Sequence, residues 1–595
     1  MNWLVYFLIA MAVLVFFLLR AVAAGAMKYK DRVLTPFRLV CVGVFLSVFL
    51  CLLPIHLDIF RDTSNSTLKA VLFSLQSTFR IFTVDSERSI LDGITCPEPW
   101  LAAAYSAFLS IAHVVAPILT FGFLASLFKN LSATLRYRCA FFNDVYVFSE
   151  LNEKSLFLAT DIRKHHKSAR IVFTNVSETS DETQSAAVEQ VRGLHGICFR
   201  KSILSVNFQH HAPLAAITFF AIGTDETQNL NESLQLIKRY GQRDKTRLYV
   251  FTTRIDGELL LANAEKGPMK VRRVNEVRSL IDRILYERGN VLFEDAKTAP
   301  DGERYISAVL IGLGQHGTEM LKALAWYCQM DGYHITVDAF DADERAEDRF
   351  AATAPELMSA AYNGVSIPGE AEYTIRIHSG VDVTTKTFAD AIARLPDTTY
   401  VFVSLGADER SIRAAVELRR LFARKRIRPT IQAVITSPDE RDALNGITNF
   451  RGQPYAIDFI GDARTSYCEK VILNSELEAE ALARHLKWGQ ESEFWQYEYN
   501  YNSSVASALH RRARIACHIP GAEKSEDALT DEERIGIEIL EHRRWNAYMR
   551  SEGYVYSGST DPSSRNDLAK MHHDLVDYAA LSEAEKRKDS CVGTI

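Results

Sequence analysis

The chain has 595 residues, of which 47% are hydrophobic and 24% are charged, and its formal net charge is −6 at pH 7. This length predicts several domains, and the small net charge argues against a nucleic-acid-binding protein. The nine cysteines show no C-x-x-C pair and no metal-ligand spacing, so we expect free thiols in a reducing compartment and no metal site. Hydropathy is uneven along the chain, because the N-terminal part alone is membrane-like.

Three apolar runs in this N-terminal part are long enough to cross a bilayer. They are Trp3–Ala24, Val40–Ile59 and Trp100–Phe128. Basic residues follow the first and third runs, and cytoplasmic segments are enriched in such residues. We therefore expect residues 1–139 to form a transmembrane region with three spans, the N-terminus outside and a large cytoplasmic body. These basic residues are Lys28, Lys30, Arg32, Arg38, Lys129, Arg136 and Arg138.

A shorter stretch between the second and third spans, Thr67–Phe82, has apolar residues at helical spacing. Two interpretations stay open: an amphipathic helix on the outer surface, and a re-entrant pore helix, which is tolerated where it lines a watery cavity. The following Thr83-Val84-Asp85-Ser86 resembles a potassium selectivity filter only in its Thr-Val start and lacks Gly-Tyr-Gly. A less selective pore would use Thr83, with Asp85 as a ring charge.

Strands alternate with helices in residues 140–290, which predicts a parallel sheet with crossover helices. Expected strands are Val145–Ser149, Arg170–Thr174, Ile217–Ile222 and Arg247–Thr252. A second unit, residues 304–490, repeats this order, and both units contain a strand followed by G-x-D-E and a helix: Gly223-Thr224-Asp225-Glu226 and Gly406-Ala407-Asp408-Glu409. We expect these acids to complement helix dipoles rather than to act in catalysis. The polar stretch Asn290–Arg304 is the expected linker.

The second unit opens with the pattern of a dinucleotide-binding site. The strand Ile306–Ile311 is followed by Gly312, Gly314 and Gly317 as G-x-G-x-x-G, then by a helix over Thr318–Cys328. A second strand, Ile335–Phe340, ends at Asp341, with Asp343 as the other candidate partner of a ribose. Glycines let a pyrophosphate approach the helix N-terminus, where free N–H groups favour an anion. A nucleotide-free unit that uses its glycines for close packing is the alternative.

A membrane segment followed by two such units resembles channels that carry regulator-of-potassium-conductance (RCK, or TrkA-N-like) Rossmann domains, over roughly residues 140–490. The resemblance implies that Gly312, Gly314, Gly317 and Asp341 hold NAD, NADH, ATP, ADP or a nucleotide-derived signal, and that domain movement opens a pore. It also implies a homo-oligomer, a tetramer by analogy. The first unit departs from the family pattern, because its turn Ser149–Lys154 has no glycine and carries Glu150 and Glu153. We expect this unit to be a structural transmitter, or to bind a different ligand.

Residues 497–595 change to helices and turns. A helix is expected to begin after Thr530, with Glu533 closing a capping box. The phrases EHRRWNAYMRSEGY, from Glu541 to Tyr554, and KMHHDL, from Lys570 to Leu575, closely resemble the ryanodine receptor (RyR) repeat domain. This resemblance implies a small helical module without a catalytic set. Cationic and aromatic side chains suit a phosphate plus a base, and the candidates are Arg543, Arg544, Trp545, Tyr548 and Tyr554. The alternative, which we prefer for Trp545, is that Trp545 and Met549 form the core of the module while the arginines pair with Glu541 or Asp531. We expect His542, His572 and His573 at helix caps or on the surface.

Three functions remain open. The first is a ligand-gated ion channel, or channel-like effector, of the bacterial inner membrane that senses a nucleotide, by analogy in anti-phage defence. The second is a membrane-anchored enzyme that uses a nicotinamide nucleotide, although no catalytic constellation is visible. The third is a regulatory subunit of a separate ion transporter. The expected fold class is a membrane α-helical segment plus cytoplasmic α/β, with tandem Rossmann-like doubly wound parallel sheets and a small helical C-terminal module.

Overall fold

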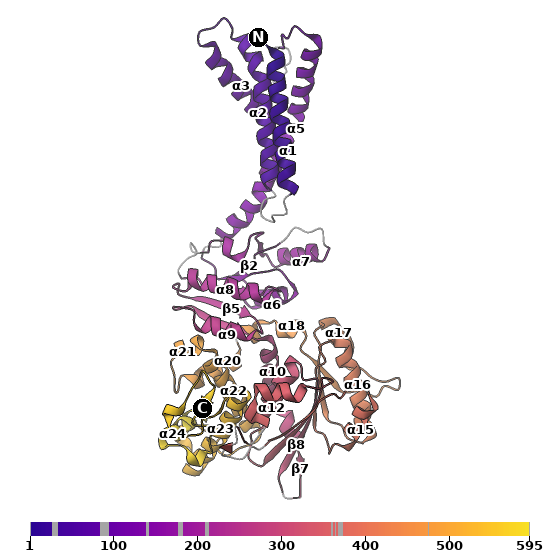
Figure 1. Ribbon diagram of the computed structural model, residues 1–595, viewed down its shortest axis with the longest axis vertical. Helices are drawn as coiled ribbons and strands as arrows, with labels where there is room; N and C mark the ends of the chain where they lie inside the picture. The colour runs from indigo at the N-terminus through magenta and orange to yellow at the C-terminus, as the bar shows by residue number, and fades with distance from the viewer. Residues whose placement is uncertain are drawn as a thin grey trace. The chain divides into compact units, whose positions relative to one another are not determined.

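The computed structural model describes residues 2–26, 34–83, 94–138, 142–176, 182–208, 214–300, 302–358, 361–362, 365–366, 373–473 and 475–593 (Figure 1). The chain divides into two compact units. The first is Met1–Ala140 with Phe199–Lys201, and the second is Phe141–Cys198 with Ser202–Ile595. The first holds the membrane-like helices, and the second holds both sheets and the C-terminal helices.

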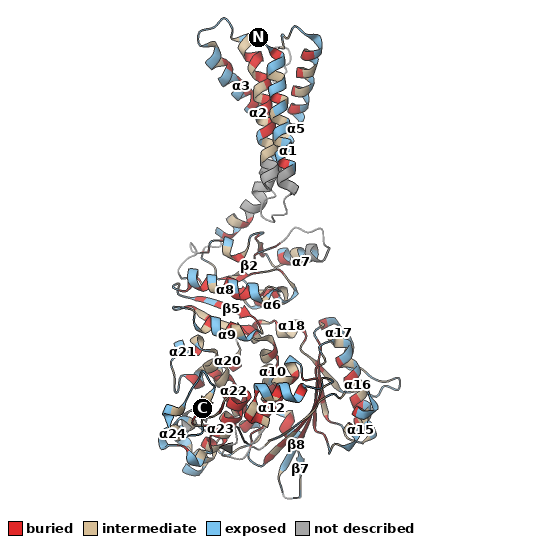
Figure 2. Cartoon of the chain, in the orientation of Figure 1, coloured by how far each residue is buried: buried red, intermediate tan, exposed pale blue. Residues whose placement is uncertain are grey.

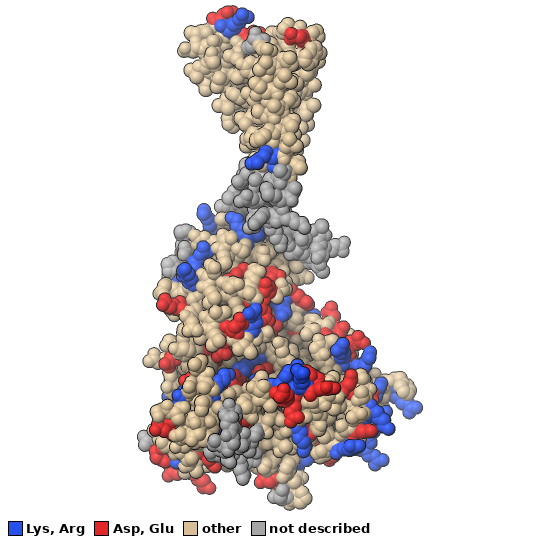
Figure 3. Space-filling model, viewed as in Figure 1, with Lys and Arg blue, Asp and Glu red and all other residues tan. Residues whose placement is uncertain are grey.

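The first unit is a bundle of α1 (Trp3–Ala26), α2 (Leu34–Ile59), α3 (Ser66–Phe82) and α5 (Pro99–Arg138). Three stretches are long and apolar enough to cross a membrane, Trp3–Val22, Leu39–Ile59 and Pro99–Phe121, as expected from the sequence. Their outer surfaces are apolar, and in Figure 3 charged side chains are sparse over them. The Tyr105 hydroxyl donates to the Trp3 carbonyl at 2.9 Å, which ties α5 to α1 inside the bundle.

The first sheet has the strand order β3-β2-β1-β4-β5-β6, with every pair parallel. Its central strands are largely buried and carry aromatic residues: Phe148 and Phe220 stack with ring centroids 4.6 Å apart. The strands are β1 (Val145–Phe148), β2 (Arg170–Phe173), β3 (Ile197–Cys198), β4 (Ile217–Ala221), β5 (Thr246–Phe251) and β6 (Lys270–Val274). The helices are α6 (Glu153–His165), α7 (Glu182–Gly193), α8 (Glu226–Tyr240) and α9 (Ile255–Ala262).

The second sheet runs β12-β9-β8-β13-β14-β15, again parallel, with β7 antiparallel at the edge of β8. Apolar residues fill both faces of its central strands, as expected for a sheet covered by helices, and these strands are largely red in Figure 2. The strands are β7 (Lys297–Thr298), β8 (Arg304–Ile311), β9 (Tyr333–Phe340), β12 (Tyr373–His378), β13 (Tyr400–Val403), β14 (Thr430–Val434) and β15 (Ile457–Ile460). The helices are α12 (Gln315–Tyr327), α13 (Ala346–Thr353), α14 (Pro355–Met358), α15 (Lys386–Arg394), α16 (Asp408–Arg424) and α17 (Pro438–Leu444).

The segment between the sheets is packed rather than a free linker. After α10 (Glu276–Arg288), residues 291–294 form α11 (Val291–Glu294), and Leu292 and Phe293 are buried in the core of the second sheet. The chain also returns to the first sheet after β15. There α18 (Ala463–Ser466) and α19 (Glu469–Ile472) lie against α6, and Tyr467 is buried in the first core beside Phe251.

The C-terminal helices share a core with the second sheet, because Tyr548 of α23 packs edge-on against Trp326 of α12, with ring centroids 6.1 Å apart. The expected capping box at Thr530 and Glu533 forms at the start of α23. A two-stranded parallel sheet, β16 (Val555–Tyr556) with β17 (Met571–His572), follows this helix. The helices are α20 (Glu476–His485), α21 (Glu491–Gln496), α22 (Glu498–Ala516), α23 (Asp531–Ser551) and α24 (Glu583–Gly593).

Candidate functional site

The glycine turn between β8 and α12 is packed tightly at two of its three glycines. Gly312 has a φ of +88°, and a Cβ there would lie 2.2 Å from the Ser404 carbonyl oxygen. A Cβ on Gly317 would lie 1.8 Å from the Gly312 carbonyl oxygen. Since real Cβ atoms do not approach so closely, both positions require glycine for packing alone.

Gly314 differs from its neighbours. It is the N-cap residue of α12, and among the described residues no side chain caps this helix end and no atom would lie within 4 Å of a Cβ there. The Asp341 carboxylate lies at the same turn and accepts the Leu313 N–H at 2.6 Å and the Asp343 N–H at 2.8 Å. Asp343 instead pairs with Arg349 at 2.5 Å. The turn therefore combines an open helix N-terminus with one adjacent acid.

The acids of the two G-x-D-E segments have structural partners. Asp225 caps α8 by accepting the Thr227 N–H at 2.8 Å, and Glu226 accepts the Thr253 N–H at 2.9 Å. Asp408 accepts the N–H groups of Thr436 and Ser437 at the end of β14. Glu409 is exposed and pairs with Arg413 at 2.8 Å, one helical turn away, as expected.

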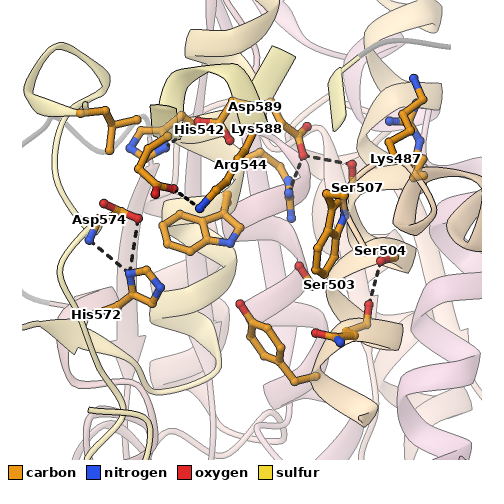
Figure 4. A pocket seen from close by; sticks show the side chains of 18 of the residues that line it. Lys487, Ser503, Ser504, Ser507, His542, Arg544, His572, Asp574, Lys588 and Asp589 are labelled. Atoms are coloured by element: carbon orange, nitrogen blue, oxygen red, sulfur yellow. Dashed lines mark hydrogen bonds and ion pairs between the residues drawn. The ribbon is translucent and has the colours of Figure 1, made fainter. Parts of the chain in front are cut away.

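One cavity lies between the end of α20 and four elements of the C-terminal module, α22, α23, α24 and β17. Its volume is about 680 Å³, a size that suits a small-molecule ligand. Figure 4 shows Ser503, Ser504 and Ser507 from α22 on one side and His542, Arg544 and His572 across from them. The lining combines cations with aromatic rings: Arg484, Lys487, Arg544, Arg565 and Lys588, and Trp488, Tyr499, Trp545, His542 and His572.

A buried group of charges lies at one end of this cavity. The Glu541 carboxylate accepts from Arg544 at 2.5 Å and from the Ser507 hydroxyl at 3.0 Å, and the Arg514 guanidinium is 3.6 Å away. Burial would raise the pKa of Glu541, but Arg544 and Arg514 lower it to about 2. Burial and neighbouring cations lower the pKa of Arg484 to about 9 and that of Arg514 to about 10. This end is therefore strongly positive in character.

The structure divides the five residues expected to bind a ligand in this module. Arg544 and Trp545 line the cavity. Arg543 pairs with Asp331, 3.2 Å away, and Tyr548 is buried against Trp326, so both serve packing between α23 and the second sheet. Tyr554 lies beside Tyr499 and below the Lys570 ammonium group, outside the cavity lining.

Three adjacent residues in the lining, His572, His573 and Asp574, place ligand atoms within 4.8 Å of one another, which is close enough for a metal ion. All three belong to the segment for which the sequence predicted no metal site. The His572 Nδ1 accepts the Asp574 N–H at 3.1 Å, and burial together with the Arg565 charge lowers the pKa of His572 to about 3. His542, His572 and His573 are buried, not at the surface as expected.

In the bundle of α1, α2, α3 and α5, which we call the membrane unit, α3 buries mainly small and polar residues and exposes apolar ones. Its buried residues are Ala70, Ser74, Ser77, Thr78 and Ile81, and its exposed apolar residues are Leu68, Val71, Leu72, Phe73, Leu75 and Phe79. The Ser74 hydroxyl lies 3.1 Å from His56 Nδ1 of α2. A helix that faces water would expose its polar residues and bury its apolar ones. Because α3 does the opposite, its exposed face suits contact with hydrocarbon.

α3 also runs back along α2. Phe73 contacts Phe60 at the end of α2, and Phe79 and Phe82 contact Phe45, near the other end of the apolar stretch. Thr95 then donates to Asp58, so the chain is again at the Ile59 end before α5 begins. Thr83 is the exposed C-cap of α3. Asp85, the expected ring charge, lies outside the described residues.

Sequence reasoning missed most of the cavity lining, including Arg484, Lys487, Trp488, Tyr499 and Arg565. One signal was available: Tyr499, Ser503 and Ser507 recur every four residues along α22, which gives a helix a polar face. The rest come from four separate segments that only the fold brings together. Comparisons with models of protein families and with curated proteins find no match to this chain.

Proposed function

We propose that this chain is a ligand-gated membrane effector with channel-like helices, controlled by a nucleotide or nucleotide-derived signal that binds the part of the chain holding the two sheets and the C-terminal module. The cavity in the C-terminal module carries this proposal, because it places cationic side chains and aromatic rings around about 680 Å³. Guanidinium and ammonium groups bind phosphate, and aromatic faces stack on bases. The module's resemblance to the ryanodine receptor repeat domain supports a regulatory role.

A second nucleotide position is the glycine turn of the second sheet. The strand orders of both sheets are those of the doubly wound dinucleotide-binding fold, which supports the Rossmann and RCK resemblance. The turn residues fit a phosphate at the α12 N-terminus, because Gly314 leaves space there and no side chain in the described part of the chain caps the helix. Asp341 still has lone pairs for ribose hydroxyls after accepting two N–H groups.

The membrane unit supports the channel-like part of the proposal. We infer that α3 is a re-entrant helix, because it enters beside the Ile59 end of α2, reaches Phe45, and is followed by a return to Asp58. A short helix whose polar face packs on a neighbouring span is compatible with a pore next to it. By the positive-inside rule the N-terminus would be outside a bacterial inner membrane. By analogy with channels, a tetramer would form the pore.

The testing experiment uses the full chain in liposomes and follows ion flux while nucleotides are added outside. The panel holds NAD, NADH, ATP, ADP, ADP-ribose and cyclic nucleotides, each also tested by thermal shift on the detergent-solubilised chain. A ligand at a hundredfold excess over its Kd stabilises the folded protein by about 2.7 kcal/mol. We expect one ligand to raise both the melting temperature and the flux.

Two variants separate the two positions. Gly314→Asp adds a negative charge at the glycine turn, and Lys487→Ala removes a positive charge from the cavity. Loss of the ligand response in Lys487→Ala alone would place the sensor in the C-terminal module. Binding of the ligand without flux, in the wild-type chain, would contradict the channel and favour a regulatory subunit of a separate transporter.

A further inference from the structure

The cavity in the C-terminal module has two chemically different ends. One end combines Arg484, Lys487 and Arg544 with the α22 hydroxyl groups of Ser503 and Ser504. The other end is lined by three acids, Asp574, Glu585 and Asp589. In Figure 4, Lys487 and the three serines lie on one side of the view, and His572 and Asp574 lie on the other.

The acids at the second end are already balanced by basic partners. Glu585 pairs with Lys588 at 2.6 Å, and Asp589 lies 3.2 Å from His542 Nδ1. Asp574 lies 3.3 Å from His573 Nε2. This end is close to neutral, and its carboxylate oxygens remain able to accept further hydrogen bonds from a ligand.

At the first end, the Arg544 guanidinium is short of hydrogen-bond acceptors. The Arg544 side chain is 2% exposed, and one of its N–H groups donates to the Glu541 carboxylate. Its Nε and Nη1 have no hydrogen-bond partner among the described residues. A buried guanidinium with unused N–H groups is costly unless another acceptor supplies the missing interaction. Arg514 and Arg484 add two further positive charges close to the same carboxylate.

The aromatic rings lie between these ends. Trp545 contacts His572 edge-on, with ring centroids 5.0 Å apart, and stacks against His542 at 5.8 Å. Burial and the charge of Arg565 lower the pKa of His572 to about 3, so this imidazole is neutral and suits contact with a flat ring. Trp545 is held in place by these neighbours and is partly exposed to the cavity.

We propose that the cavity binds a phosphorylated nucleoside in one orientation. The phosphate lies at the end formed by Arg484, Lys487 and Arg544, the base lies against Trp545, and sugar hydroxyl or base amino groups donate to Asp574, Glu585 or Asp589. This inference rests on the proposed function, because it specifies the ligand of the same cavity. A dianionic phosphate supplies the acceptor that the buried Arg544 guanidinium lacks, and its negative charge offsets the positive charges around it.

The test measures binding to the full chain in detergent by isothermal titration calorimetry. The probes are AMP, GMP, CMP and UMP, each paired with its nucleoside, and inorganic phosphate. We expect at least one monophosphate to bind about tenfold or more tightly than its nucleoside. Lys487→Ala and Arg544→Lys should each remove most of that preference and leave the affinity for the nucleoside unchanged. Asp574→Asn should weaken both members of the pair by the same factor.

Arg543→Ala is the matched control, because Arg543 is the neighbour of Arg544 on α23 but pairs with Asp331 outside the cavity. It should bind all probes as the wild type does, and the melting temperature of each variant without ligand reports whether it folds. Equal binding of monophosphates and nucleosides, no binding by any probe, or equal losses in Arg543→Ala and Lys487→Ala would overturn the inference. Phosphate-dependent binding without a change in ion flux would leave it standing and contradict the gating proposal instead.

Discussion

The two parallel sheets share a strand order but end their first strand in opposite ways. In the first sheet, the turn after β1 is filled by its own polar side chains: Asn152 caps α6 and donates to the Ile222 carbonyl at 2.7 Å, and Ser149 accepts the Ile222 N–H. In the second sheet, the turn after β8 is made of glycines and leaves the start of α12 uncapped. The same topology thus yields one sealed turn and one open turn.

The acidic segments differ in the same way. In the first sheet, Asp225 caps the helix and Glu226 bonds to the end of the next strand. In the second sheet, Asp408 bonds to the end of the next strand and Glu409 is exposed. The residues that match in the two G-x-D-E segments therefore occupy different structural positions, and the acid that bonds to the next strand is shifted by one residue. This comparison teaches that a repeat in sequence predicts the place of a turn but not what its side chains do.

The largest expected effect comes from adding a side chain at the most tightly packed glycine of the turn after β8. Gly317→Ala should destabilise the fold by about 3 kcal/mol or more, because its Cβ would collide with the backbone oxygen of Gly312. Gly314→Ala is the control and should cost less than about 1 kcal/mol, since a Cβ there meets open space. Chemical denaturation of the two variants measures the difference. Equal losses would show that the tight packing at Gly317 does not hold.

The one-residue shift between the acidic segments makes a crossed prediction. Asp408→Ala should cost about 2 kcal/mol, because the N–H groups of Thr436 and Ser437, just after β14, lose a charged acceptor. Glu409→Ala should change stability by less than about 0.5 kcal/mol, as exposed ion pairs do. In the first sheet the order reverses, with Glu226→Ala more costly than Asp225→Ala. Denaturant midpoints of the four variants test the pattern, and identical ranking in both sheets would refute it.

The sealed turn depends on one amide side chain. Asn152→Ala removes the helix cap and the bond to the Ile222 carbonyl, and should destabilise the chain by about 1–2 kcal/mol. Glu153→Ala, at the next and exposed position, is the control and should be close to neutral. Hydrogen exchange of the α6 amides should rise in the first variant only. Unchanged exchange would mean that the turn is held by other contacts.

The smallest effect concerns pH. Burial would raise the pKa of Glu226, but hydrogen bonds from Thr252 and Thr253 lower it below its usual value. A carboxyl with a lowered folded-state pKa stabilises the fold above its unfolded pKa of about 4.3, and this contribution is lost as the pH falls through the folded value. Glu226→Gln should therefore show a weaker loss of stability on acidification. A parallel pH profile for variant and wild type would contradict this.

Patterns of apolar residues were enough to predict much of the fold. The three apolar spans and the predicted strands of both sheets formed close to the expected bounds, because continuous apolar runs specify buried strands and spans. The strands β3, β6, β12 and β15 were not predicted. The capping box of α23 also formed as its local spacing predicts. These features depend on residues close in sequence.

The site was less predictable for the opposite reason. Arg544 and Trp545 were found from a local phrase, whereas Arg484, Tyr499 and Arg565 come from other segments and meet them only in the folded chain. The sequence also could not show which arginine of this phrase lines the cavity, because Arg543 and Arg544 are the same residue type. Only the direction of each side chain from α23 puts one against Asp331 and the other in the cavity.

The return of the chain to the first sheet after β15 has a practical consequence. Glu469 of α19 is held by His165 at 3.0 Å and His166 at 2.6 Å, and Tyr467 covers Phe251 in the first core. A protease that cuts once between the two sheets would therefore leave two pieces that stay associated. A fragment ending near residue 300 would expose apolar surface that the segment 463–473 covers in the intact chain. Dissection of this protein into separate domains should keep that segment with the first sheet.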